Sequence, residues 1–280
     1  MAVAIDQSAV SRCISAVSKA IAAKLLQRYC AFPRTEEELA HIKKRFAAMS
    51  GIPGCIGAID CTHIAIIAPS APTYREAVYV NRKGYRSLNV QMVCDADLFI
   101  TSVNARYPGS SHDSFIWRKS ALHDLLHGGH VSLGEGGWLL GDSGYPLEPW
   151  ILTPILGDEP ELEAEWVDLY NRVQATARGT IERCFGVLKS RFRCLLRLRA
   201  LHYNPTAAAN IIYACAVLHN ICKLYGLPDP DVLSLTTEED SSELYRAPSR
   251  HPQVARTDLR ANGAMIRQSI LLRLVEQRLQ

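Results

Sequence analysis

Two apolar segments of the sequence have the composition of buried strands, and each carries one aspartate. Residues 55–68 hold Asp60 in their interior, and residues 138–141 end directly at Asp142. β-branched apolar runs of this kind predict strands that are covered on both faces. An ionised carboxylate in such a place costs free energy unless it is paired or bound to a metal. Each aspartate could instead cap a neighbouring loop or helix, and one residue alone does not decide between these interpretations.

The order of the predicted elements indicates a mixed α/β sheet flanked by helices. The turn sequence at residues 95–97 predicts a hairpin between two of the strands. A helix over residues 113–126 is expected before the strand that ends at Asp142. Strands are expected at residues 55–68, 85–94, 99–106, 138–141 and 150–156. Three antiparallel strands followed by a helix and a parallel strand is the order of ribonuclease H-like nucleases, so we expect this fold.

Helices are expected on both sides of the sheet-forming region. Residues 6–24 have apolar residues at helical spacing, and Ser8 can cap this helix. Thr35 and Glu38 have the spacing of a capping box and begin a second helix. Later helices are expected up to residue 170, from residue 175 or 180 onward, over 210–225 and over 260–279. We therefore divide the chain into a helical segment (1–50), a nuclease-type domain (51–228), and a polar linker with a final helix (229–280).

A basic helix supplies a third acidic residue, Glu182. Between residues 178 and 199 the sequence has seven basic residues and one acid, a pattern that suits a phosphate backbone beside a metal. The apolar stripe of this helix is Ile181, Phe185, Leu188 and Phe192. Candidates for DNA contact are Arg178, Arg183, Lys189 and Arg193. Glu182 could instead pair with Arg178 or Arg183 on a solvated face.

Three carboxylates, Asp60, Asp142 and Glu182, are the predicted catalytic residues. Carboxylate oxygens favour Mg²⁺ or Mn²⁺ over zinc, and two such ions roughly 3.5–4 Å apart can drive phosphodiester hydrolysis. Asp113 follows a predicted strand and is a fourth candidate metal ligand. It could also cap the helix that it opens.

The same residues lie in segments that resemble the PIF/Harbinger superfamily of transposases, in particular the Harbinger transposase-derived nucleases. The resemblance extends from about residue 10 to residue 227. It rests on the segments GAIDCTHI, YVNRKGYRSLNVQMVCD, PGSSHDS, WLLGDSGYPL, TPI, TIERCFGVLKSRFRCL and ACAVLHNIC.

The resemblance implies a ribonuclease H-like DDE domain, a metal-dependent nuclease that acts on DNA. Its divalent metal would be held by Asp60, Asp113, Asp142 and Glu182. It also implies a nuclear protein, found in the cytoplasm as well, with a Myb-like DNA-binding partner. The family has a helix-turn-helix ahead of the nuclease, and DQSAVSRCISAV is similar to its last helix, so residues 1–50 are expected to be a remnant of that module.

Composition narrows the remaining choices. Nine cysteines without a C-x-x-C pair argue against a disulfide scaffold. The sequence has no run of eighteen apolar residues, so a membrane-spanning helix is not expected. The formal net charge of +3 does not by itself identify a polyanionic partner. Self-association of the chain into a homo-oligomer is a further possibility.

Two rival functions remain: a catalytically silent DNA- or protein-binding module, and a metal-dependent phosphatase for small molecules. Cys215, His219 and Cys222 share a helical face, where a packed core is the preferred interpretation over a metal site.

Overall fold

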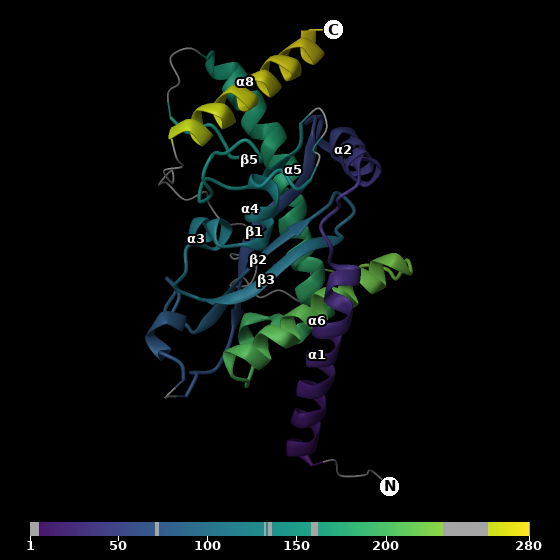
Figure 1. Cartoon of the computed structure of the whole chain (residues 1–280), viewed down its shortest axis with the longest axis vertical. Coiled ribbons are helices and arrows are strands. Elements are labelled where there is room, and N and C mark those ends of the chain that lie inside the picture. Colours follow the sequence, from purple (N-terminus) through teal and green to yellow (C-terminus); the bar gives the residue numbers. More distant parts are fainter. Residues whose placement is uncertain are drawn as a thin grey trace.

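A five-stranded mixed sheet forms the centre of the molecule (Figure 1). The computed structural model describes residues 6–70, 73–131, 133, 136–157, 162–231 and 257–279. The strands are β1 (Cys55–Ala65), β2 (Ser87–Cys94), β3 (Ile100–Pro108), β4 (Trp138–Leu140) and β5 (Ile151–Leu152). Their order is β3-β2-β1-β4-β5, with β1, β2 and β3 antiparallel and β4 and β5 parallel to β1. This arrangement confirms the predicted ribonuclease H-like α/β fold.

Helices surround this sheet on both faces. They are α1 (Gln7–Tyr29), α2 (Glu36–Ser50), α3 (Asp113–Arg118), α4 (Ala121–His127), α5 (Ala164–Arg191), α6 (Pro205–Leu224) and α8 (Thr257–Leu279). Short 3-10 helices occur at Glu76–Tyr79, Arg193–Leu195 and Arg197–Arg199. The predicted linker falls mostly on residues 232–256, which lie outside the described residues.

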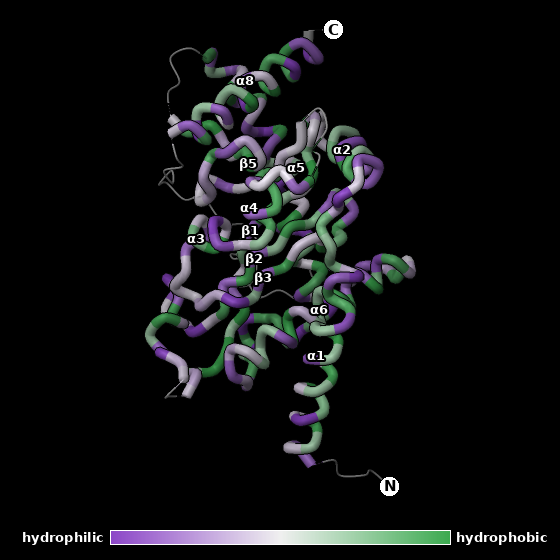
Figure 2. The backbone as a smooth tube through the Cα atoms, viewed as in Figure 1, coloured by the Kyte–Doolittle hydropathy of each residue, from purple (hydrophilic) through white to green (hydrophobic). Residues whose placement is uncertain are grey.

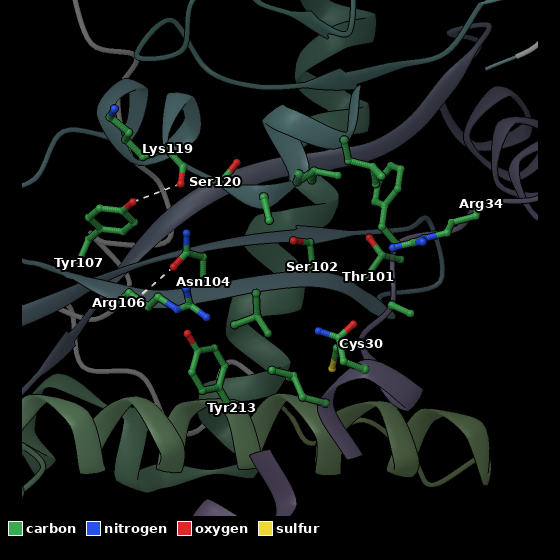
Figure 3. Close-up of a pocket in the computed structure, with 18 residues that line it drawn as sticks. Cys30, Arg34, Thr101, Ser102, Asn104, Arg106, Tyr107, Lys119, Ser120 and Tyr213 are labelled. Atoms are coloured by element: carbon green, nitrogen blue, oxygen red, sulfur yellow. Dashed lines mark hydrogen bonds between the residues drawn. The ribbon is translucent and has the colours of Figure 1, made fainter. Parts of the chain in front are cut away.

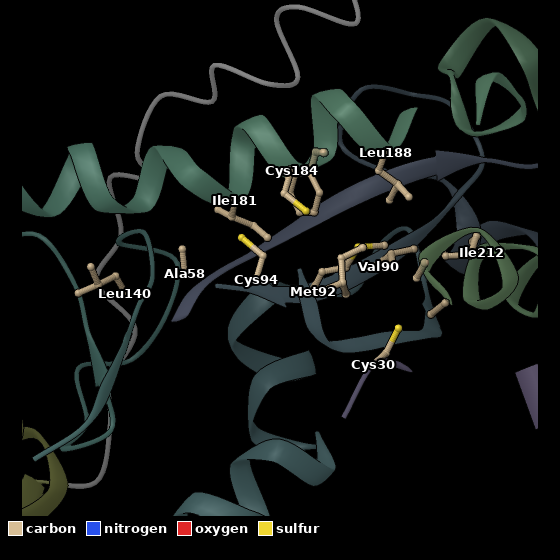
Figure 4. Close-up of a cluster of buried hydrophobic side chains, with 14 of the residues drawn as sticks. Cys30, Ala58, Val90, Met92, Cys94, Leu140, Ile181, Cys184, Leu188 and Ile212 are labelled. Atoms are coloured by element: carbon tan, nitrogen blue, oxygen red, sulfur yellow. The ribbon is translucent and has the colours of Figure 1, made fainter. Parts of the chain in front are cut away.

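The two faces of the sheet bury two separate apolar clusters. Helices α5 and α6 cover one face, where Ile181 and Leu188 of α5 point toward β2, which contributes Val90, Met92 and Cys94 (Figure 4). Helices α3 and α4 cover the other face, where Trp117 and Leu122 pack on strand residues that include Ile59. The hydropathy colouring shows the same distribution, with apolar segments concentrated in the sheet and the helices beside it (Figure 2). The sheet is therefore the middle layer of three.

Two predicted helix boundaries were wrong. The helix expected over 113–126 is two helices, because the Ser120 side chain accepts a hydrogen bond from the backbone N–H of His123 and begins α4 anew. Conversely, α5 is one helix of 28 residues where two were expected. Its buried residues Tyr170, Gln174 and Ala177 continue the stripe that includes Ile181, and this packing offsets the roughly 1 kcal/mol that a helical glycine costs.

The N-terminal helices pack on the same core as the sheet. The capping box of Thr35 and Glu38 is confirmed at the start of α2. In α1 the N-cap is Asp6 rather than Ser8, because the Asp6 carboxylate accepts from the Ser8 backbone N–H. The first half of α1 extends away from the body (Figure 1), and its predicted apolar stripe is largely exposed there.

The cysteines are unpaired, as expected, whereas one helix is more apolar than the sequence analysis predicted. All nine cysteines are free thiols. One described helix, α6, is by length and composition apolar enough to cross a membrane, with a mean hydropathy of 1.3. Its apolar residues, such as Ile212 and Val217, belong to the main core, as expected for the central helix of a folded domain.

Candidate metal centre

Three buried aspartates come together beside the central strand β1. Asp60 lies in β1, Asp113 is the first residue of α3, and Asp142 follows β4. One carboxylate oxygen of each lies within 4.8 Å of the others. The three residues are 4%, 8% and 5% exposed. Such a concentration of negative charge away from water is unfavourable unless cations or hydrogen bonds balance it.

Strand register explains why Asp60 and Asp142 come together. Strands β1 and β4 are parallel neighbours, and Ala58 pairs with Leu140. Asp60 and Asp142 lie two residues beyond this pair in the same direction, so they are next to each other. The carboxyl ends of parallel strands are where α/β sheets place ligands.

Asn89 of β2 holds the third aspartate in place. Its side-chain N–H donates to Asp113 Oδ1 at 3.0 Å and to the backbone oxygen of Ser111 at 2.8 Å. Asp113 does not cap α3, since the N-cap position belongs to His112 and makes no side-chain capping bond. Asn89 was not predicted from the sequence, although it is one of three polar residues, with Ser87 and Gln91, that alternate with apolar residues in this strand.

Backbone donors fix the other two carboxylates. Asp60 Oδ1 accepts from the N–H of Cys61 at 2.7 Å, and Asp142 Oδ1 accepts from the N–H of Gly144 at 2.9 Å. The bond to Gly144 is the loop-capping role that was one of the two interpretations of Asp142. It restrains the side chain in the orientation that places it near Asp60, so capping and ligand binding are compatible here.

Glu182 stands beside the three aspartates and is joined to them by Arg178. Both residues lie on α5, one turn apart, and the Arg178 guanidinium contacts Glu182 Oε1 at 2.6 Å. Its other terminal nitrogen lies 3.3 Å from Asp60 Oδ2. The pairing of Glu182 with Arg178, one of the two alternatives from sequence, is therefore present. It occurs in a largely enclosed place, because the Glu182 side chain is only 16% exposed.

Burial and the acidic group raise the pKa of a neighbouring tyrosine, Tyr145. Burial raises the pKa of Tyr145 well above its ordinary value, and the neighbouring Cys61, Asp113 and Asp60 raise it further. The Tyr145 hydroxyl lies 3.4 Å from the Cys61 sulfur. Tyr145 therefore stays a neutral hydroxyl that closes one side of the carboxylate group.

The four basic residues predicted to contact DNA do not share one surface. Arg178 contacts the acidic group, and Lys189 is 3% exposed. Burial of Lys189 is at odds with direct contact to a duplex on the surface. Arg183 is exposed beside Met49, and Arg193 lies beyond the end of α5 in a 3-10 helix. Two of the four thus present their charge outward.

The helical face of Cys215, His219 and Cys222 has a structural role. His219 is buried, and its Nε2 bonds the backbone oxygen of Leu98 at 2.8 Å. Cys215 is buried and Cys222 is half-buried on the same face, so this face of α6 packs toward the core, as the preferred interpretation expected.

The carboxylate centre and the sheet around it define a class of protein. The sequence pattern of one family, described as DDE superfamily endonuclease, matches residues 59–220. This match covers more than half of the 280 residues and includes Asp60, Asp113, Asp142 and Glu182. The chain belongs to that family.

Curated relatives agree with the Harbinger resemblance. A human protein named "Putative nuclease HARBI1" is 38% identical over 227 residues, which are 81% of this chain and 62% of the human protein. The Bos taurus protein of the same name is 39% identical over the same shares. An Arabidopsis thaliana protein named "Protein ALP1-like" is 31% identical over 196 residues, 66% of this chain and 47% of that protein. The chain spans less than two thirds of these relatives. No solved structure matches it significantly.

Proposed function

We propose that this chain is a metal-dependent DNA endonuclease that hydrolyses phosphodiester bonds. The observation that carries the proposal is the group of three buried aspartates, with oxygens within 4.8 Å of one another, in a DDE superfamily endonuclease domain. Asp60, Asp113 and Asp142 would hold the metal, and Glu182 would complete the set from α5.

The ligands fit a hard divalent cation. All members of the group are carboxylates, and oxygen ligands suit Mg²⁺ or Mn²⁺ whereas zinc prefers nitrogen and sulfur. When bound, one or two such ions supply activation of the attacking water and neutralisation of the leaving oxygen. Four carboxylates drawn from β1, α3, β4 and α5 are enough to support the two-ion arrangement.

The chain's own residues orient the reacting groups. Hydrogen bonds from Asn89 and from the backbone N–H groups of Cys61 and Gly144 hold the three aspartates in place. Arg178 lies among the acids with a planar guanidinium that suits two phosphate oxygens at once. We propose that Arg178 turns from Asp60 and Glu182 toward the scissile phosphate when DNA and metal enter.

The proposed substrate and partners follow from the family. DNA is the substrate in this proposal, and the exposed Arg183 and Arg193 are available to its phosphates. A Myb-like DNA-binding partner, action in the nucleus and also the cytoplasm, and self-association are proposed from the Harbinger resemblance. Imaging of a fluorescent fusion and analytical ultracentrifugation test localisation and self-association; cytoplasmic fluorescence alone and a strictly monomeric species would contradict them.

Cleavage of supercoiled plasmid tests the activity. The wild-type chain should nick plasmid with Mg²⁺ or Mn²⁺ and lose activity with a chelator. Asp60→Asn, Asp142→Asn and Glu182→Gln should each fall by at least about 100-fold, since even outer-shell changes at metal sites cost 10–100-fold. Asp124→Asn is the matched control, because this aspartate is exposed on α4 and its side chain is 79% accessible.

Circular dichroism of every variant separates loss of chemistry from loss of fold. Equal cleavage by wild type and the three site variants would refute the active-site assignment. DNA binding that is retained while neither metal produces cleavage would instead support the silent binding module.

A further inference from the structure

A groove runs along the outer edge of the sheet, beside β3 (Figure 3). Its volume is about 350 Å³. Strand β3 is the last strand in the order β3-β2-β1-β4-β5, so no described strand lies on its outer side. The other walls come from the end of α1 and the segment after it, from the start of α4, and from Tyr213 of α6. The groove lies two strands away from β1 and the three aspartates.

Successive residues of β3 line this groove. Thr101, Ser102, Val103 and Asn104 all contribute, and Arg106 and Tyr107 follow. Neighbouring side chains of a strand point to opposite faces of a sheet. Both faces can border a single groove only where it follows the edge of the strand. The groove is therefore a channel along a sheet edge rather than a pocket on one face.

The structure already uses this edge to bind polar groups in the manner of a neighbouring strand. The Asn220 side chain accepts from the N–H of Ile100 at 2.8 Å and donates to its C=O at 2.7 Å. Further along, the Tyr213 hydroxyl accepts from the N–H of Ala105 at 3.1 Å. Side chains of α6 thus take the place of backbone partners at Ile100 and Ala105, and Thr101, Ser102, Val103 and Asn104 line the groove between these two contacts.

Charge around the groove has one sign. Arg34, Arg106 and Lys119 contribute three exposed cations from three separate segments, and Figure 3 shows them around the rim. None of the 18 described residues that line the groove is acidic. The floor is apolar and includes Phe32 and Leu122. An apolar floor inside a basic rim suits a strand whose side chains alternate between apolar and acidic.

We propose that this groove binds an extended acidic segment of a partner protein, which adds to β3 as a sixth strand. Strand addition takes affinity from backbone hydrogen bonds and specificity from alternate side chains. The apolar floor receives apolar side chains of the added strand, and Arg34, Arg106 and Lys119 on the rim pair with its acidic side chains. A nucleic acid fits less well, because phosphates gain nothing from the apolar floor. The surface is distinct from the carboxylate centre, so it stands independently of the nuclease proposal.

Selection from a display library of random dodecapeptides on the full chain tests this surface. Peptides that are enriched should carry acidic residues at alternate positions, and fluorescence anisotropy of the synthetic peptides then gives their affinity. The double variant Arg106→Glu with Lys119→Glu should weaken binding by at least about tenfold. Arg118→Glu is the matched control, since this exposed arginine neighbours Lys119 but does not line the groove.

Backbone pairing has its own test in the same assay. In an added sixth strand, every second residue would donate its backbone N–H to β3. N-methylation of the odd-numbered peptide residues and of the even-numbered ones gives two peptides, and only one of the two should lose binding. The proposal is overturned if no peptide is enriched, if enriched peptides lack acidic residues, or if the double variant binds them as wild type does. Displacement of the peptide by a single-stranded oligonucleotide would assign the groove to nucleic acid instead.

Discussion

Replacing Arg178 with methionine removes the cation that the structure places between Asp60 and Glu182. The guanidinium lies 3.3 Å from Asp60 Oδ2 and 2.6 Å from Glu182 Oε1, and its side chain is 14% exposed. Removal of one partner from a fully buried ion pair costs about 3–5 kcal/mol. Because Arg178 and Glu182 retain some contact with water, we expect a loss of about 2–3 kcal/mol in the free energy of unfolding without metal.

That loss corresponds to a fall of roughly 5–10 °C in Tm for a domain of this size. Addition of Mn²⁺ should reverse most of it, because a cation bound to the native state alone stabilises that state by mass action. Freed from competition with the guanidinium, the carboxylates should bind Mn²⁺ about tenfold more tightly than in wild type, a difference of about 1.4 kcal/mol.

Differential scanning fluorimetry across a Mn²⁺ titration measures both effects, and calorimetry gives the affinity directly. Arg172→Met is the matched control, since this arginine is exposed on the same helix. It should change neither quantity. If Arg178→Met has wild-type Tm without metal and wild-type Mn²⁺ affinity, then Arg178 does not balance the acidic group and the electrostatic account of the centre is wrong.

Three further changes test the support of Asp113, the start of α4 and the turn between β2 and β3. Asn89→Ala frees Asp113 and should weaken Mn²⁺ binding by about 10–100-fold while the circular dichroism spectrum is retained; unchanged affinity would contradict the positioning role. Ser120→Ala removes the cap of α4 and should lower the free energy of unfolding by about 1 kcal/mol in urea titrations, and an unaltered midpoint would count against it. Burial raises the pKa of Asp95 to about 6. This carboxyl therefore contributes stability below its unfolded pKa near 3.8 that is lost as pH rises through about 6. An asparagine at this position does not ionise, so the Tm of Asp95→Asn relative to wild type should rise as the pH increases from about 4 to 7. A Tm difference between variant and wild type that does not vary with pH would refute the assignment.

Helix starts and strands that depend on residues close together in the sequence were predicted correctly. The capping box of Thr35 and Glu38 placed the start of α2, and apolar runs placed the strands of the sheet. The order of these elements was sufficient for the ribonuclease H-like fold. The position of Asp60 inside an apolar strand and of Asp142 just after one was also visible, because it follows from strand boundaries alone.

Features that depend on long-range packing were not predicted. The continuity of α5 through Gly179 comes from burial of its stripe against the sheet, which a glycine signal alone cannot reveal. Burial of Lys189 likewise depends on what packs around the helix. The ion-paired position of Arg178 required the placement of α5 relative to β1, because Arg178 and Asp60 are 118 residues apart in sequence.

The carboxylate centre illustrates the same division. Sequence favoured Asp60, Asp142 and Glu182, with Asp113 as the fourth ligand. The structure brings Asp113 into the group within 4.8 Å and places Glu182 beside it, across Arg178. The contribution of Asp113 depends on Asn89, which lies 24 residues earlier on β2. The spacing of the acidic residues along the chain reveals neither the closeness of the three aspartates nor the contact between Asn89 and Asp113.

Anomalous X-ray scattering from crystals soaked in Mn²⁺ tests the central claim most directly, since it locates the cation without any assumption about activity. The account predicts a manganese peak within coordinating distance of Asp60, Asp113 and Asp142, and loss of that peak in Asp60→Asn. It also predicts that Arg178 moves away from Asp60 when the ion is bound. A manganese peak elsewhere, with the three aspartates unligated at saturating Mn²⁺, would contradict it.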